Sequence, residues 1–248
     1  MTQAPRCPTR PKLSLLGGFG LVLDDAPVTL GIQEQRVLAY LALVRPPPLA
    51  HRRAGLAERL WAGPAVRAAA SLRTALWRLR QADERLVRAS RDTVRLHEAV
   101  DADVWRCAAQ AGRLLAGDQE LRPQDTSLAV LRGDLLPGWD EEWLLLERER
   151  LGQVRIHALE ALAGRLCGLG RYLEAIEAAY AAIGEDPLRE SAHAALIEVF
   201  LAEGNVAQAR RQFERYTVLL WAEMALRPSA GLTRRVRGCA EVAARAAG

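Results

Sequence analysis

The chain has 248 residues, of which 50% are apolar and 26% charged, a composition typical of a folded soluble protein with one large or two small domains. Four cysteines are too few for a disulfide-stapled scaffold, and no run of about 18 apolar residues predicts a membrane span. No apolar stretch with a cleavage site follows the basic N-terminus, so we expect no secretory signal and a cytoplasmic location.

Charge is distributed unevenly along the chain, although the total is only +4. Residues 1–95 carry 16 basic and 7 acidic side chains, whereas residues 96–248 carry 18 basic and 23 acidic ones. A net charge of +9 on the first part and −5 on the second indicates two domains, the first suited to a polyanion. A GC-rich genome would explain why all but one of the 34 basic residues are arginine, but not their uneven distribution.

The cysteines and histidines form no recognisable metal or redox motif. The four cysteines are far apart, without a CxxC pair, and the four histidines are equally scattered. We therefore expect isolated thiols in a reducing cytosol, and neither a metal site nor a cofactor.

The N-terminal part begins with strands. Residues 1–12 are rich in proline and basic side chains and are predicted to form a disordered tail. Residues 13–30 alternate short apolar runs with turn signals, which predicts a small antiparallel β-meander. From residue 33 the apolar spacing becomes helical, and this first helix is expected to stop at the prolines 46–48.

Two further helices and a hairpin complete the first domain. Helices are expected over about 51–61 and 65–82, separated by a Gly-Pro break. Two β-like runs, 86–88 and 94–96, are joined by a short polar segment and predict a hairpin. The order of strands, three helices and hairpin is that of a winged helix-turn-helix domain, which we assign to residues 13–97.

The remainder, residues 101–248, is predicted to be almost entirely helical. The segment Gly170–Ala175 recurs as Gly204–Ala209 at an offset of 34 residues, the tetratricopeptide period. Chance similarity between two alanine-rich hairpins is the alternative. We predict a tetratricopeptide-like repeat domain, and a fold that is mostly α with a small β component. Helices are expected near residues 102–116, 124–132, 140–169, 172–184, 188–203, 205–226 and 229–246.

The third helix has an apolar and a polar face. Leu72, Leu76 and Leu79 share a stripe, with alanines including Ala69 beside them, and this stripe is expected to face the core. The polar face and the hairpin carry side chains that bind phosphates and base edges. A solvated surface helix is the alternative, but the basic hairpin favours DNA. The expected DNA-contacting residues are Arg67, Ser71, Arg73, Thr74, Trp77, Arg78, Gln81, Arg88 and Arg91.

These features resemble a known family. Residues 13–96 resemble the winged-helix output domain of OmpR-type response regulators, and Ser71–Gln81 (SLRTALWRLRQ) is similar to its recognition helix. Residues 101–240 resemble the bacterial transcriptional activator domain, and the whole is similar to the SARP family, the Streptomyces antibiotic regulatory proteins. The segments that carry this second resemblance are Leu135–Leu151 (LLPGWDEEWLLLERERL), Asp186–Glu190 and Arg227–Leu232.

The resemblance implies a transcriptional activator, often of secondary-metabolite gene clusters, that binds tandem direct repeats near a −35 element. The implied partners are double-stranded DNA, RNA polymerase holoenzyme through its σ subunit, and a second copy bound head-to-tail on DNA, with no membrane contact. Thr93–Leu96 stands where the family's wing usually has a Gly-Tyr-Arg-Leu-like strand. The loop implied to lie nearest polymerase comprises Trp61, Ala62, Gly63, Pro64 and Ala65.

Larger members of that family add an ATPase domain, whereas this chain has no GxxxxGK[ST] loop. We also expect no receiver domain before residue 13. We therefore expect control neither by ATP nor by phosphorylation in cis.

An acidic segment, residues 140–149, raises the possibility of an enzyme. Its carboxylates are expected on the outer side of a helix without a partner histidine, which favours a solvated or partner-binding face over a catalytic site. The apolar residues of the segment are expected to pack, namely Trp139, Trp143, Leu144 and Leu145. No nucleophile–base pair or phosphate loop supports catalysis, and no catalytic residue is expected. Two alternative functions stay open. The protein could be an adaptor that binds an acidic protein, or a repressor that uses the same DNA-binding helix. The helical domain could serve dimerisation, contact with the transcription machinery or ligand sensing.

Overall fold

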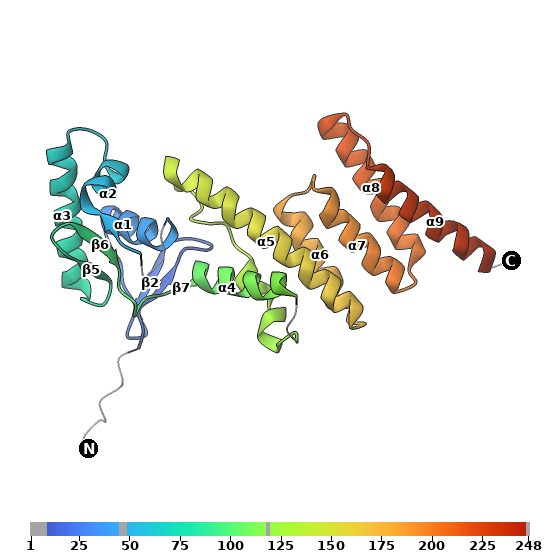
Figure 1. Cartoon of the computed structure of the whole chain (residues 1–248), viewed down its shortest axis with the longest axis horizontal. Helices are drawn as coiled ribbons and strands as arrows, with labels where there is room; N and C mark the ends of the chain where they lie inside the picture. The colour runs from blue at the N-terminus through green and yellow to red at the C-terminus, as the bar shows by residue number, and fades with distance from the viewer. Residues whose placement is uncertain (1–8, 45–48, 118–119, 247–248) are drawn as a thin grey trace, which may run out of the picture. The chain divides into compact units, whose positions relative to one another are not determined.

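The computed structural model describes residues 9–44, 49–117 and 120–246, with side chains described as far as residue 238 (Figure 1). The chain forms two compact units. The first comprises Met1–Cys107 and Gly133–Glu149, and the second Ala108–Arg132 and Arg150–Gly248. The fold is mostly helical with a small β component, as the sequence predicts. Gly133–Glu149, expected to belong to the helical domain, lies in the first unit.

The β-meander is confirmed at the start of the first unit. Strand β1 (Lys12–Ser14) pairs antiparallel with β2 (Gly20–Leu23), which pairs antiparallel with β3 (Ala26–Pro27). Asp24 and Asp25 adopt left-handed backbone conformations in the tight β2–β3 turn, which aspartate tolerates. Strand β7 (Asp101–Ala102) adds a parallel edge to β1 that the sequence did not predict.

The predicted tail lies mostly outside the described residues, which begin at residue 9. Lys12, placed in that tail, is already the first residue of β1, where it lies opposite Val22. The prolines 46–48 also lie outside the described residues, and helix α1 (Ile32–Leu43) ends before them.

A helix-turn-helix and a three-stranded sheet follow. Helices α2 (Arg53–Leu60) and α3 (Ala65–Ala82) pack against each other, and α3 has the predicted bounds. The second helix begins later than expected because β4 (His51–Arg52) pairs with β6 (Thr93–Leu96). Strand β5 (Val87–Ala89) pairs with the other edge of β6, which confirms the predicted hairpin.

The apolar stripe fixes the rotation of α3 about its axis. Leu72, Leu76 and Leu79 are buried, as expected. Ala69 is exposed, so its assignment to the core face was wrong. At 100° per residue Ala69 falls at the margin of the stripe, on the opposite side from the buried Ala68.

The segment Gly133–Glu149 packs onto the rest of the first unit through backbone hydrogen bonds and its two tryptophans. Gly17 donates its backbone N–H to the Asp134 carbonyl at 2.8 Å. Trp139 stacks on Phe19 with ring centroids 6.1 Å apart. The expected packing role of Trp139 is confirmed.

Helix α5 (Glu142–Gly168) begins in this segment with one buried leucine followed by two exposed ones. Trp143 meets the ring of Tyr40 edge-on, and Leu144 is fully buried, both as expected. Leu145 is 62% exposed, contrary to expectation, because adjacent residues of a helix point about 100° apart.

The acidic residues of this segment do not all face solvent. Glu141 accepts hydrogen bonds from Arg36 Nη2 at 2.9 Å and from Trp143 Nε1 at 3.0 Å. The outward orientation expected for Glu141 was therefore wrong, whereas Asp140, Glu142 and Glu149 are exposed. Glu141 links α1 to the start of α5 by an ion pair that the sequence did not reveal.

The second unit is built from helices. Where the sequence predicts a helix over 124–132, the chain forms two 3-10 turns, separated by Ser127 in an extended conformation. Pro123, which has no backbone N–H to donate, stands at the start of the first turn. Besides α5, the elements are α4 (Asp103–Ala116), η1 (Pro123–Thr126), η2 (Leu128–Leu131), α6 (Tyr172–Glu185), α7 (Glu190–Ala202), α8 (Val206–Met224) and α9 (Ala230–Ala246).

The repeat has matching geometry in both copies. Gly170 and Gly204 have positive φ angles of 71° and 83° and follow α5 and α7 respectively. In each case the N–H of the next residue bonds back five residues, Arg171 to Leu166 and Asn205 to the Phe200 carbonyl. This is the Schellman motif that ends many helices. The shared turn supports a structural repeat rather than chance similarity.

Candidate nucleic-acid interface

The outer face of α3 presents most of the predicted DNA-contacting residues. Arg67, Arg73, Thr74, Trp77 and Gln81 are exposed, and the indole of Trp77 is 59% exposed although it is apolar. This orientation follows from the buried leucine stripe on the opposite face. Arginine, threonine and glutamine on one exposed helix face can donate to phosphates and base edges.

Three predicted residues of α3, including the exposed Thr74, are only partly exposed or already have a partner within the chain. Ser71 is only partly exposed. The Thr74 hydroxyl donates to the carbonyl of Ala70 in its own helix at 3.2 Å. Arg78 pairs with Glu34 of α1, and Arg78 Nη1 lies 3.4 Å from Glu34 Oε1. The Arg78 guanidinium thus has a partner within the chain before any ligand binds.

The Glu34 carboxylate is buried, with only 3% of its side chain exposed, whereas Arg78 is 59% exposed. A side chain on Gly31 would overlap this carboxylate, so glycine at that position leaves room for it. A buried carboxylate is stable only with a partner, and Arg78 supplies one. This pair could not be predicted from the sequence, because its members are 44 residues apart.

The hairpin places Arg91 at its exposed tip. Ser90 and Thr93 close the turn: the Ser90 N–H donates to the Thr93 carbonyl at 2.8 Å, and the Thr93 N–H to Ser90 Oγ at 3.0 Å. Within the described part of the chain, the Arg91 guanidinium makes no ion pair. Arg91 is therefore available to an anionic ligand.

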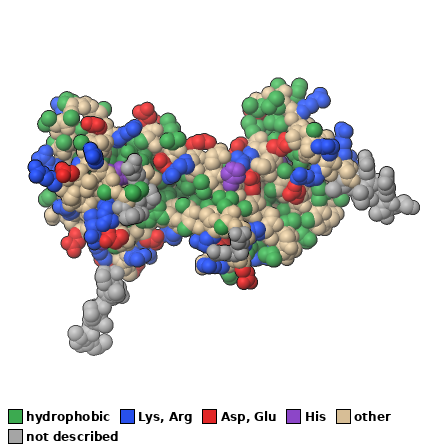
Figure 2. All heavy atoms as spheres, in the orientation of Figure 1, with side chains coloured by type: hydrophobic (Ala, Val, Ile, Leu, Met, Phe, Trp, Pro, Cys, Tyr) green, Lys and Arg blue, Asp and Glu red, His purple; other side chains and the backbone are tan. Residues whose placement is uncertain are grey.

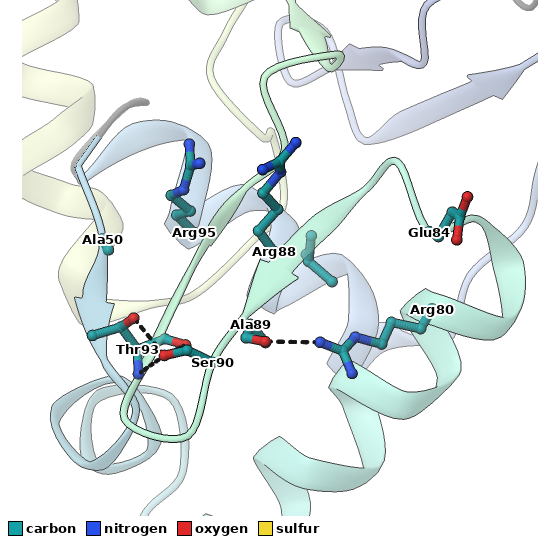
Figure 3. A pocket seen from close by; sticks show the side chains of 9 residues that line it. Ala50, Arg80, Glu84, Arg88, Ala89, Ser90, Thr93 and Arg95 are labelled. Atoms are coloured by element: carbon teal, nitrogen blue, oxygen red, sulfur yellow. Dashed lines mark hydrogen bonds between the residues drawn. The ribbon is translucent and has the colours of Figure 1, made fainter.

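Two arginines outside the predicted site fasten the hairpin to the helices. Arg53 Nη1 donates to the Ser90 carbonyl at 2.9 Å, and the Arg53 N–H donates to the Asp92 carbonyl. Arg80 Nη2, on α3, donates to the Ala89 carbonyl at 2.9 Å (Figure 3). These contacts hold the hairpin in a fixed position beside α3.

Arg88 lies on the outer surface of the hairpin next to a second arginine. Arg88 Nη2 is 2.7 Å from Glu98 Oε1, and Arg95 Nη1 is 3.4 Å from Glu98 Oε2. The pKa of Glu98 is lowered, first by a hydrogen bond from its own backbone and then by the charge of Arg88. Arg95 and Glu98 also belong to this surface of the hairpin, although the sequence did not predict a role for either residue.

Arg88 and Arg95, but not Glu98, line an open pocket of about 630 Å³, together with Arg80 of α3 (Figure 3). Its polar lining comprises Arg80, Arg88, Arg95, Glu84, Ser90 and Thr93. Figure 2 shows Lys and Arg side chains (blue) in the region of α3 and the hairpin, with acidic side chains (red) among them.

The loop that the resemblance places nearest polymerase runs between α2 and α3. Ala62, Gly63, Pro64 and Ala65 are exposed, and Gly63 has a φ of 107°, which glycine adopts without strain. Trp61 is partly buried, and the Arg36 guanidinium lies 5.9 Å from its ring centroid. The loop is therefore anchored at one end and open to solvent along the rest.

The side chains described in residues 9–44, 49–117 and 120–238 include no group of three or more histidines, cysteines, aspartates or glutamates that could hold a metal ion. None of the described helices is long and apolar enough to cross a membrane.

Comparisons with known proteins match both the helical part and the whole chain. Residues 100–238 match the family described as bacterial transcriptional activator domain. The fold is similar to that of Mycobacterium tuberculosis EmbR, solved in complex with a low-affinity phosphopeptide, with a TM-score of 0.77 and 23% sequence identity. The similarity covers 94% of this chain, which spans 65% of the length of the EmbR chain. A comparison with curated proteins gave no match. A winged helix followed by this domain is the SARP-type organisation expected from the sequence, and the chain belongs to the bacterial transcriptional activator domain family.

Proposed function

We propose that this chain is a sequence-specific DNA-binding transcriptional activator that uses α3 as its recognition helix and the β5–β6 hairpin as its wing. The observation that supports the proposal most directly is the exposure of basic and polar side chains on the outer face of α3. There the guanidinium groups of Arg67 and Arg73 are exposed and make no ion pair within the described part of the chain. Thr74 and Gln81 on the same face supply groups that distinguish bases.

The domain division supports this assignment. The basic winged helix, residues 13–97, would bind DNA, and the acidic helical domain, residues 101–248, would be repelled by phosphates and face proteins instead. RNA polymerase holoenzyme, contacted through its σ subunit by residues 61–65, is the partner that the family resemblance favours. We further propose that two copies bind head-to-tail on tandem direct repeats, and that the protein acts in the cytoplasm and is not an enzyme.

Selection of bound duplexes from a random library tests the proposal without a known operator. We expect the wild-type chain to enrich one motif in two tandem copies. The Arg73→Ala variant should lose enrichment at the positions that this side chain reads, whereas Arg210→Ala, which removes an exposed arginine of α8, should select the same motif. Enrichment of no motif by the folded wild-type chain would contradict sequence-specific binding and favour the adaptor.

Transcription in vitro with polymerase holoenzyme then separates the activator from the repressor. A promoter carrying the selected motif should give more transcript when the protein is added. A decrease in transcript at the same DNA occupancy would identify a repressor with the same recognition helix.

A further inference from the structure

The outer face of the wing brings two like charges into direct register. Arg88 of β5 lies opposite Arg95 of β6 in the antiparallel ladder. Both point away from the core because their neighbours Val87, Val94 and Leu96 are buried. Like charges directly opposite each other on a sheet are destabilising unless an anion lies between them.

Glu98 supplies that anion from within the chain. Its two carboxylate oxygens contact different arginines, Oε1 contacting Arg88 at 2.7 Å and Oε2 contacting Arg95 at 3.4 Å. One carboxylate leaves this trio with a net positive charge. Glu98 and Arg88 are each about half exposed, so an external anion can reach the same guanidinium groups.

The surroundings carry further side chains of the kinds that bind phosphate, beside one carboxylate, Glu84. The pocket beside the two arginines is also lined by Arg80 and by the hydroxyl residues Ser90 and Thr93 (Figure 3). Guanidinium groups pair with carboxylates and phosphates alike, and serine and threonine hydroxyls commonly contact phosphate oxygens. The guanidinium groups of these three arginines form a second cluster of hydrogen-bond donors, separate from the cluster on the exposed face of α3.

Arg80 connects the pocket with the proposed recognition helix. It follows Arg73 by seven residues, about two helical turns, so the two share a face of α3. Arg80 also binds the Ala89 carbonyl of the wing at 2.9 Å. A DNA backbone that follows this face of α3 would reach the pocket at its C-terminal end.

We propose that Arg88 and Arg95 form a phosphate-binding site for the DNA backbone, in which the Glu98 carboxylate occupies the position of the phosphate and competes with it. This inference rests on the proposed DNA binding. The competition makes Glu98 a determinant of affinity: a phosphate enters only by displacing a carboxylate of the same chain.

The test compares salt dependence in a mutational cycle. Glu98→Gln keeps the shape of the side chain and removes its charge. We expect tighter DNA binding and a slope of log affinity against log salt concentration that is steeper by about 0.9, the value for one added phosphate contact. Arg95→Ala in the Glu98→Gln background should abolish both gains. Glu84→Gln, which changes the charge at the rim of the same pocket, should give a smaller gain that persists after Arg95→Ala.

Three outcomes decide the inference. Equal gains for Glu98→Gln and Glu84→Gln, both independent of Arg95, would overturn the site and leave only a general charge effect. Failure of every variant to bind DNA at low salt would instead refute the proposed function. Titration of the Glu98→Gln variant with inorganic phosphate tests whether the site instead binds free phosphate. The assignment to DNA would be overturned if this variant bound phosphate at millimolar concentration, lost that binding on Arg95→Ala, and showed no change in the slope of log DNA affinity against log salt concentration.

Discussion

At the scale of single residues, the pair formed by Glu34 and Arg78 changes the role expected for an arginine of the proposed recognition helix. From the sequence, Arg78 stands among the side chains that contact DNA. In the structure its guanidinium also compensates a buried carboxylate on α1. Arg73 has no such partner in the described part of the chain. Two arginines five residues apart on one helix are therefore expected to behave differently on mutation.

Arg78→Ala is predicted to lower the free energy of unfolding by about 1 kcal/mol, a value discounted because Arg78 is more than half exposed. Arg73→Ala should leave it unchanged. Adding Glu34→Gln to Arg78→Ala should restore part of the loss, because the carboxylate that lacks a partner is then gone. Urea unfolding of the three variants measures this. Equal stability of Arg78→Ala and Arg73→Ala would show that the pair contributes nothing.

The sequence could not reveal such pairs. The stripe of Leu72, Leu76 and Leu79 is a local pattern, and it correctly predicted which face of α3 is exposed. Ion pairs such as Arg36 with Glu141 depend on how distant segments meet, and no local spacing encodes that. The proposed role of Glu98 was missed although Arg95 is only three residues away, because it depends on the strand register that places Arg88 opposite Arg95.

At the scale of elements, those with a strong periodic pattern were predictable and those formed by pairing alone were not. Helix α3 has the predicted bounds, since a Gly-Pro turn precedes a regular apolar stripe. Strands β4 and β7 have two residues each, too short for any alternation, and they exist only because β6 and β1 offer them partners. The helix expected at 124–132 had apolar residues but is interrupted at Ser127.

A buried polar cluster joins α7 to α8 and to the turn that precedes α7. His193 is buried, and its Nε2 lies 2.9 Å from the Pro187 carbonyl while its Nδ1 lies 2.8 Å from Gln212 Nε2. The ring of Tyr216 stacks on it with centroids 4.2 Å apart. Gln212 can donate to Nδ1 when the ring is neutral and Nε2 carries the proton, so the cluster fits a neutral histidine.

Burial lowers the pKa of His193 below its usual value of 6.5. The unfolded chain therefore binds this proton more readily than the folded one. The stabilisation is complete above pH 6.5 and is lost as the pH falls below that value toward the lower pKa of the folded state. Thermal unfolding between pH 8 and pH 5 should show this loss in the wild type. His193→Gln should be less stable at pH 8 but lack this component of the pH dependence. The same pH dependence in both proteins would exclude His193 as its source.

At the scale of the whole molecule, a total charge of +4 conceals +9 on residues 1–95 and −5 on the rest. The basic part contains α3 and its wing, where the proposed DNA contacts lie. The acidic part contains all of the residues matched by the bacterial transcriptional activator domain. The small net charge is the difference between a part proposed to bind DNA and a part proposed to bind proteins.

The measurement that tests the central claim most directly is the affinity for a labelled duplex carrying the selected motif, determined by fluorescence anisotropy over a range of salt concentrations. Log affinity should fall linearly with log salt, with a slope of about −0.9 for each phosphate contacted. Arg73→Ala should lose about 1–3 kcal/mol of binding free energy if it reads a base, while Arg210→Ala should match the wild type. Binding that does not weaken at high salt, or an Arg73→Ala variant that binds as well as the wild type, would contradict DNA recognition by α3.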